Sequence, residues 1–254
     1  MRKARPQTLY HEKAPLMRLL AEQSFSRAAG APHVPGNSVR LLKDADQNYP
    51  AWLEAMEAAE KSIHFENYIL ADDEIGRSFA AVMADKARQG VRVRLLYDWF
   101  GCLGRSSGRF WNHLKNAGVE VRCFNPPSAL HPFGWFNRDH RKMITVDGLV
   151  GFVSGLCVSR KWAGDKGRSI EPWRDTGIMV KGPAVADIER AFADTWSVLG
   201  APLPKDEVPE RGGIQPAGDV TLRVISSLPN TAWVYRLDQL IATLARQTLW
   251  LTDA

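Results

Sequence analysis

The spacing of apolar residues changes repeatedly between the helical and the strand period, and this alternation constrains the fold most. Residues 52–59 carry apolar side chains at helical spacing, and residues 63–69 then alternate with a period of two. The helical segments 74–89 and 110–117 each end at a glycine, and a strand-like run follows each of them. Strands that alternate with helices predict an α/β fold, a layered sheet flanked by helices.

The second half of the chain extends this pattern. Residues 141–153 form a predicted hairpin of two strands, with its turn at Asp147 and Gly148. A further strand is predicted at 176–181 and a helix at 185–199.

Charge and cysteine content limit the classes of partner and cofactor. The chain has 254 residues with 33 Lys and Arg against 28 Asp and Glu, a formal net charge of +5. This excess favours anionic partners such as phosphates or acidic lipid surfaces, but it is too small for a polybasic nucleic-acid domain, so we expect no stable nucleic-acid partner. The three cysteines are an odd number at unrelated spacings. They fit neither a disulfide framework nor a zinc site, so we expect a reducing compartment, no metal and no cofactor.

The sequence contains no segment that reads as a leader or a membrane span. Residues 1–15 are basic and polar, and no apolar core follows them. The longest weakly polar run, 148–159, has 12 residues, whereas a spanning helix needs roughly 20. We expect a chain that is soluble or that lies on a membrane without crossing it.

A similarity between two segments of the sequence predicts the domain organisation. Residues 200–218 are rich in Pro, Gly and charge, which is typical of a linker. After this segment, residues 222–225 resemble 39–42, and 245–253 resemble 59–67. We therefore expect one complete repeat and the beginning of a second, in a record that is a truncated piece of a longer protein. The predicted parts are an N-terminal extension at 1–38, a first repeat at 39–199, the linker at 200–218, and the start of a truncated second repeat at 219–254.

The segment 125–137 is a predicted loop because it contains three prolines and a glycine. It also carries Phe133, Trp135 and Phe136. These rings either insert at a membrane interface, where aromatic side chains partition, or fold back over the core.

A histidine and a lysine stand two positions apart on the first strand of the predicted hairpin. Residues two apart on a strand share a face, so His140 and Lys142 point together while Arg141 points away. This arrangement places a nucleophile beside a cation. Asp147 completes the pattern H-x-K-x-x-x-x-D and is counted with them as a candidate catalytic residue, although its place at the turn favours a role in ordering that turn. For an isolated H-x-K, the default interpretation is a solvated strand.

Further stretches give the motif its context: FENYILADDEIG at 65–76, GVRVRLLYDWFG at 90–101, NRDHRKMITVDG at 137–148, WRDT at 173–176 and GPAVADIERAFADTW at 182–196. With these, residues 39–254 resemble the phospholipase D superfamily, in particular its bacterial cardiolipin synthases. The resemblance implies that two repeats each donate one such motif to a shared active site. It also implies metal-independent transfer through a phosphohistidine, an anionic phosphatidylglycerol-like substrate, and a peripheral position at the membrane surface on the cytoplasmic side of the inner membrane.

The resemblance also marks residues that support the pocket. Asp175 matches an acidic position that orients the catalytic imidazole, and a surface pair with Arg174 is the alternative. Cys157 departs from the family pattern, because an asparagine is usual there and a thiol hydrogen-bonds only weakly. The full supporting set is Glu66, Asn67, Ser154, Gly155 and Asp175. Of these, Glu66 and Asn67 face opposite sides of a strand, so at most one of the two lines the pocket.

Three functions stay open at this level. The first is a phosphatidyltransferase of the cardiolipin synthase type. The second is a phospholipase D-type hydrolase of lipid or nucleic acid, in which water replaces the acceptor. The third is a catalytically silent half that acts as a lipid-surface module. A second catalytic histidine, which must protonate the leaving alcohol, would lie beyond Ala254 in the missing second repeat or come from a homodimer partner.

Overall fold

The computed structural model describes residues 8–128, 137–226 and 231–250, and the chain separates into two compact units. The larger unit comprises residues 35–220. The smaller unit comprises residues 1–34 together with 221–254.

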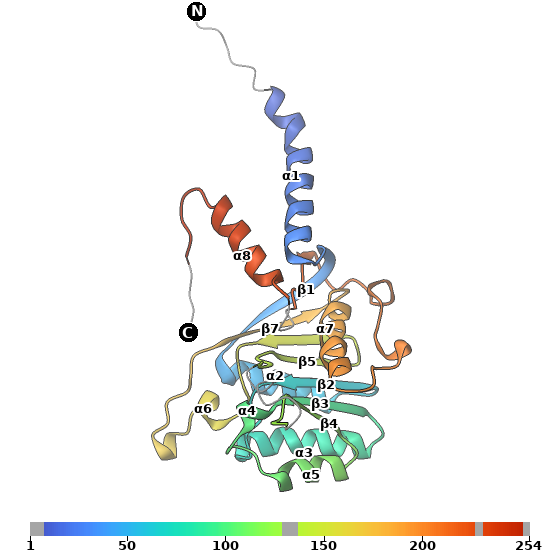
Figure 1. Cartoon of the computed structure of the whole chain (residues 1–254), viewed down its shortest axis with the longest axis vertical. Coiled ribbons are helices and arrows are strands. Elements are labelled where there is room, and N and C mark those ends of the chain that lie inside the picture. The colour runs from blue at the N-terminus through green and yellow to red at the C-terminus, as the bar shows by residue number, and fades with distance from the viewer. Residues whose placement is uncertain (1–7, 129–136, 227–230, 251–254) are drawn as a thin grey trace, which may run out of the picture. The chain divides into compact units, whose positions relative to one another are not determined.

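A mixed sheet forms the centre of the larger unit (Figure 1). The strand order is β4-β3-β2-β5-β6-β7-β1-β8. Neighbours β2, β3 and β4 pair in parallel, whereas β2–β5, β5–β6, β6–β7 and β7–β1 are antiparallel. The strands are β1 (Val34–Lys43), β2 (Ser62–Asn67), β3 (Arg92–Asp98), β4 (Glu120–Phe124), β5 (Lys142–Val146), β6 (Val150–Ser154), β7 (Thr176–Lys181) and β8 (Val220–Leu222).

Helices cover both faces of this sheet, which confirms the predicted α/β class. Helices α2, α3 and α5 share one core with the strands on one face, and α7 packs on the other, against β2, β5 and β6 (Figure 1). Gly90 and Gly118, at φ +91° and +98°, end two of the helical segments as the sequence predicts, because this left-handed conformation disfavours other residues. The helices are α2 (Asp44–Glu57), α3 (Glu74–Arg88), α4 (Trp99–Cys102), α5 (Gly108–Asn116), α6 (Arg160–Ala163) and α7 (Val185–Val198).

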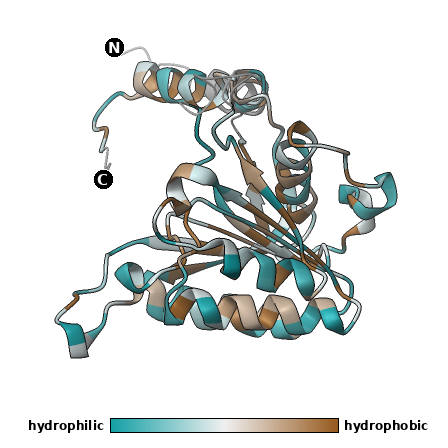
Figure 2. Cartoon of the chain, turned by 60° about the horizontal axis from the view of Figure 1, so that its bottom comes forward, coloured by the Kyte–Doolittle hydropathy of each residue, from teal (hydrophilic) through white to brown (hydrophobic). Residues whose placement is uncertain are grey.

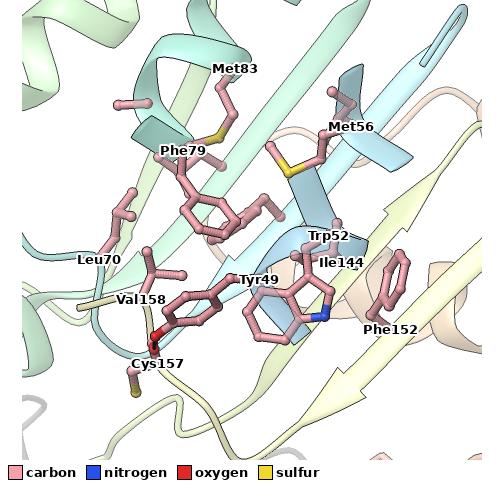
Figure 3. Close-up of a cluster of buried hydrophobic side chains, with 14 of the residues drawn as sticks. Tyr49, Trp52, Met56, Leu70, Phe79, Met83, Ile144, Phe152, Cys157 and Val158 are labelled. Atoms are coloured by element: carbon pink, nitrogen blue, oxygen red, sulfur yellow. Dashed lines mark hydrogen bonds between the residues drawn. The ribbon is translucent and has the colours of Figure 1, made fainter. Parts of the chain in front are cut away.

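The core on the α2 and α3 face is built around aromatic rings. Trp52 and Phe79 are almost fully buried, with ring centroids 6.2 Å apart, and Tyr49 lies 5.5 Å from each. Figure 3 shows the hydroxyl of Tyr49 directed toward Cys157, whose carbonyl oxygen accepts its hydrogen bond at 2.6 Å. This contact fixes the segment after β6 to the core. In Figure 2 the strands are largely brown, and the outer surfaces of the covering helices are largely teal.

The predicted linker carries no strand or α-helix, but it is fastened to the larger unit. Leu203 and Ile214 are buried. Glu207 lies in a short 3-10 turn, Lys205–Glu207, and forms ion pairs with Arg94 and Arg92 of β3. Composition predicts the lack of regular structure, whereas these long-range ion pairs leave no local sequence signal.

The smaller unit consists of α1 (Thr8–Ala29), α8 (Trp233–Leu244) and the residues around them. Gly30 lies against the ring of Trp233, so closely that an added Cβ would stand 2.7 Å from a ring carbon. The described residues 245–250 form neither helix nor strand. None of the helices in the described part of the chain combines the length and the hydropathy of a membrane span.

The antiparallel pairing gives the sheet two chemically different ends. One of these ends, called an edge below, contains the last residues of β2, β3 and β6 and the first residues of β5 and β7. At the opposite edge lies the hairpin turn between β5 and β6, where Asp147 has φ +56°. Its carboxylate accepts three backbone N–H groups, those of Glu60 at 2.9 Å, Lys61 at 2.7 Å and Ser62 at 2.8 Å. Asp147 therefore joins the hairpin to the start of β2.

We expect Asp147→Ala to lower the free energy of unfolding by about 2 kcal/mol, because three amides lose a charged acceptor and alanine disfavours positive φ. Asp147→Asn, which keeps one acceptor oxygen and tolerates this conformation, should lose less. Urea unfolding followed by circular dichroism measures both variants. An alanine variant as stable as the parent would show that the carboxylate does not hold this edge.

Candidate active site

His140 and Lys142 meet at the other edge of the sheet, around the ring of Tyr68. Lys142 is the first residue of β5 and is buried, whereas His140 precedes the strand and is exposed. The imidazole and phenol ring centroids lie 4.6 Å apart, and the Lys142 ammonium lies 5.1 Å from the centroid of the same phenol ring. Lys142 Nζ also donates to the carbonyl oxygen of His140. The structure thus brings together the two residues that the sequence places on one face.

Electrostatics favour a neutral imidazole at this position. Partial burial lowers the pKa of His140, and the positive charge of Lys142 lowers it further. Burial also lowers the pKa of Lys142, while Asp139, Asp175 and other neighbouring groups favour its charged form. A neutral imidazole beside a cation is the state that a nucleophile attacking an anionic phosphodiester requires.

Arg141 points to the opposite face of the sheet, as the strand period predicts. Its guanidinium lies 2.8 Å from Glu66 Oε1 and donates to the carbonyl oxygen of Ala191 in α7 at 3.1 Å. Burial raises the pKa of Glu66 well above its ordinary value, and Asp139 adds to this effect. Glu66 therefore belongs to a buried network under α7 and lies away from His140 and Lys142.

Asn67, and not Glu66, lies beside Lys142. The register of β2 and β5 makes Asn67 and Lys142 direct partners, so their side chains share a face. The Asn67 amide donates to the carbonyl oxygen of Leu156 at 3.4 Å and accepts the N–H of Ile69 at 3.2 Å. It thereby holds the segment after β6 at the edge of the pocket.

Asp175 and Gly155 are in direct contact at the same edge. A Cβ on Gly155 would stand 2.2 Å from Asp175 Oδ1. The Asp175 carboxylate accepts the indole N–H of Trp162 at 3.2 Å and the N–H of Thr176 at 2.8 Å. Within the described residues it makes no hydrogen bond to His140. The alternative surface pair is not formed either, since Arg174 binds Asp44 at 2.9 Å.

The remaining predicted residues divide between the two edges and the undescribed loop. Ser154 accepts the N–H of Leu156 at 3.2 Å and shapes the turn after β6. Asp147 is separated from Lys142 by the length of β5, about 17 Å at 3.3 Å per residue, and it orders the turn at the opposite edge, as its place in the sequence favours. Phe133, Trp135 and Phe136 lie outside the described residues, and their contact with a membrane stays a prediction.

Two residues at this edge escape the sequence analysis. Tyr68 follows the last residue of β2, where the period of two no longer reports orientation. Asp98 ends β3, and its buried carboxylate accepts the N–H groups of Phe100 at 2.9 Å and Asp139 at 3.0 Å. It thus holds the segment that carries His140. An aspartate directly after a buried strand is the local signal that would have marked it.

Comparison with known proteins agrees with this geometry. Residues 52–196 match the family model described as cardiolipin synthase, PLD-like domain. The chain is 32% identical over 232 residues to cardiolipin synthase A of Pseudomonas fluorescens (strain SBW25), covering 87% of this chain and 46% of the relative. It is also 32% identical over 223 residues to the cardiolipin synthase of Alkalihalophilus pseudofirmus, covering 85% and 44%. The chain therefore spans less than half the length of these curated relatives.

A solved structure, the phosphatidylserine synthase of Haemophilus influenzae Rd KW20, matches with a TM-score of 0.53 at 15% identity, over 76% of this chain and 45% of that chain. This likeness shows a shared fold. Because the family model covers more than half of the chain, the resemblance inferred from the sequence is confirmed: the protein belongs to the cardiolipin synthase, PLD-like domain family.

Proposed function

We propose that this chain supplies one half of the active site of a phosphatidyltransferase of the cardiolipin synthase type. The observation that carries the proposal is the exposed imidazole of His140 and the buried ammonium of Lys142, both held against the ring of Tyr68. The substrate is an anionic, phosphatidylglycerol-like phospholipid presented at the membrane surface, on the cytoplasmic side of the inner membrane. The names of the curated relatives support this substrate class.

The proposed reaction has two displacements at phosphorus. An imidazole nitrogen of His140 attacks the phosphodiester, the bond to the head-group alcohol breaks, and a phosphohistidine forms. The leaving alkoxide takes a proton from a general acid. That acid is the second histidine, contributed by a second repeat or a partner copy. The hydroxyl group of the acceptor lipid then returns its proton to this base and displaces His140.

Lys142 neutralises charge in both steps. The non-bridging oxygens become more negative as the nucleophile approaches, and a preorganised cation in a water-poor site stabilises that charge. The buried side of the pocket already orients the ammonium through the His140 carbonyl oxygen and the Tyr68 ring. If water replaces the acceptor, the same geometry performs hydrolysis.

We expect His140→Asn in the complete protein to abolish transfer and any acid-labile phosphoenzyme, because the nucleophile is lost. Lys142→Ala should lower turnover by about 10²–10³-fold, since the charge on the phosphorus oxygens loses its cation. The matched control is Lys115→Ala, which removes an exposed lysine from α5. Conversion of phosphatidylglycerol in mixed micelles measures all three variants. Substantial activity in His140→Asn would reject the assignment of the nucleophile.

The protonation of His140 gives a second test. Burial and the charge of Lys142 both disfavour the imidazolium, so its titration midpoint should lie below the ordinary value of 6.5. Lys142→Gln removes one of these two causes, and the midpoint should then rise toward 6.5. Imidazole chemical shifts followed against pH measure both proteins. A midpoint that Lys142→Gln leaves unchanged would show that the ammonium does not act on this histidine.

A further inference from the structure

A pocket of about 340 Å³ lies at the same edge of the sheet as His140 and Lys142. We call it the α6 pocket, because α6 and the residues on either side of it form one wall. Figure 1 shows the yellow segment that carries α6 projecting beyond the sheet. Its volume falls within the roughly 300–1,000 Å³ of small-ligand sites. The apolar lining consists of Ile69, Ala71, Trp162, Ile170 and Trp173.

Two tryptophans dominate the apolar lining. The ring centroids of Trp162 and Trp173 lie 4.9 Å apart in an edge-to-face arrangement. Trp162 is buried, and the Asp175 carboxylate takes its indole N–H, so this ring offers the pocket apolar surface without an unpaired donor. Trp173 is 52% exposed and stands at the mouth. An exposed indole at the mouth of an apolar pocket suits a ligand that arrives from a lipid surface.

The two aspartates that line the pocket also form contacts within the fold. The Asp73 carboxylate caps α3 by accepting the N–H group of Gly76 in its first turn at 3.0 Å, and it accepts the N–H group of Arg160 at 2.8 Å. Asp72 forms an ion pair with Arg77 at 2.7 Å. Arg77 thus offsets the charge of Asp72, whereas Asp73 keeps its negative charge, which two backbone amides stabilise.

Two cations of the lining have no such partner. Arg105 donates to the carbonyl oxygen of Gly101 at 2.8 Å, and the Lys161 ammonium lies 5.5 Å from the centroid of the Trp173 ring. Both side chains are exposed, and neither forms an ion pair with a carboxylate in the parts of the chain that the structure describes. The lining has three cations, Arg105, Arg160 and Lys161, against the two carboxylates of Asp72 and Asp73. The α6 pocket thus combines an apolar wall with a small excess of positive charge, which matches an anionic amphiphile.

Two covalent or hydrogen-bonded links connect the α6 pocket with the proposed catalytic pair. Ile69 of the wall directly follows Tyr68, which contacts both His140 and Lys142. On the other side, Asp175 binds Trp162 and contributes to the potential at Lys142. The wall of the α6 pocket is therefore joined, through Tyr68 and Asp175, to the groups that would react with the phosphate of its ligand.

We propose that the α6 pocket binds the glycerol ester region and the first acyl carbons of the anionic phospholipid whose phosphate reacts at His140. This inference rests on the proposed function, for which it supplies the lipid-binding subsite. Trp162 and Trp173 contact the acyl carbons, Arg105 and Lys161 attract the anionic lipid, and the rest of both acyl chains stays in the bilayer.

Binding is tested first without turnover, in the complete protein carrying His140→Asn. The probe is dihexanoyl phosphatidylglycerol below its micelle concentration, titrated by calorimetry. We expect Trp173→Ala to raise the dissociation constant about tenfold, because it removes an exposed indole from the mouth. The matched control is Leu149→Ala, which removes a 61% exposed apolar side chain beside the hairpin turn at the opposite edge of the sheet and should change nothing. Lys161→Gln changes the surface and leaves the core intact. It should weaken the binding of dihexanoyl phosphatidylglycerol more than the binding of dihexanoyl phosphatidylcholine.

Acyl-chain length gives an independent readout in the active protein. From dibutanoyl to dihexanoyl phosphatidylglycerol, kcat/KM should rise about fourfold for each methylene that enters the pocket. Trp173→Ala should flatten this dependence, whereas Leu149→Ala should keep it.

The outcomes separate the two proposals. Binding to the His140→Asn variant that depends on Trp173, together with no turnover of phosphatidylglycerol by the protein that keeps His140, would support the α6 pocket and reject the proposed function. If neither Trp173→Ala nor Lys161→Gln changes lipid binding or the dependence of turnover on acyl length, the α6 pocket is not the lipid-binding subsite. A single-stranded oligonucleotide that binds through Trp173 and displaces the lipid would overturn the lipid as its occupant.

Discussion

The burial of the Lys142 ammonium is the constraint on which the site depends. A charged group taken out of water costs several kcal/mol unless nearby groups compensate it. Here a carbonyl oxygen and the face of a phenol ring give partial compensation, and carboxylates at greater distance add to it. No described carboxylate forms a direct ion pair with Lys142. An ammonium held in this way is ready for a phosphate oxygen.

The pairing of β2 with β5 lets one sheet keep two polar systems apart. On one face the register sets Asn67 beside Lys142, and on the other Arg141 reaches Glu66 and the carbonyl oxygen of Ala191. Since successive residues of a strand alternate, a shift of one residue in this pairing would exchange the two environments. The buried network under α7 therefore stabilises the register that leaves His140 exposed.

The sequence predicts the elements well because their signals are local. Periodicity and the glycines at 90 and 118 mark helices and strands, and the position of His140 two residues from Lys142 predicts a shared face. Contacts between distant segments leave no such signal. Neither the choice between Glu66 and Asn67 nor the partnership of Asp175 with Trp162 follows from spacing, because each depends on which strands become neighbours. Tyr68 lies just past the end of β2, where periodicity no longer indicates orientation, and the contact between Asp98 and Asp139 spans 41 residues of sequence.

Cys157, which stands where the family usually has an asparagine, has a consequence for chemical durability. Burial raises the pKa of its thiol to about 11, so at neutral pH only about one molecule in ten thousand carries the thiolate. The thiolate is the form that oxidants and alkylating agents attack. Burial and a raised pKa therefore make this thiol a poor target for oxidants and alkylating agents at neutral pH.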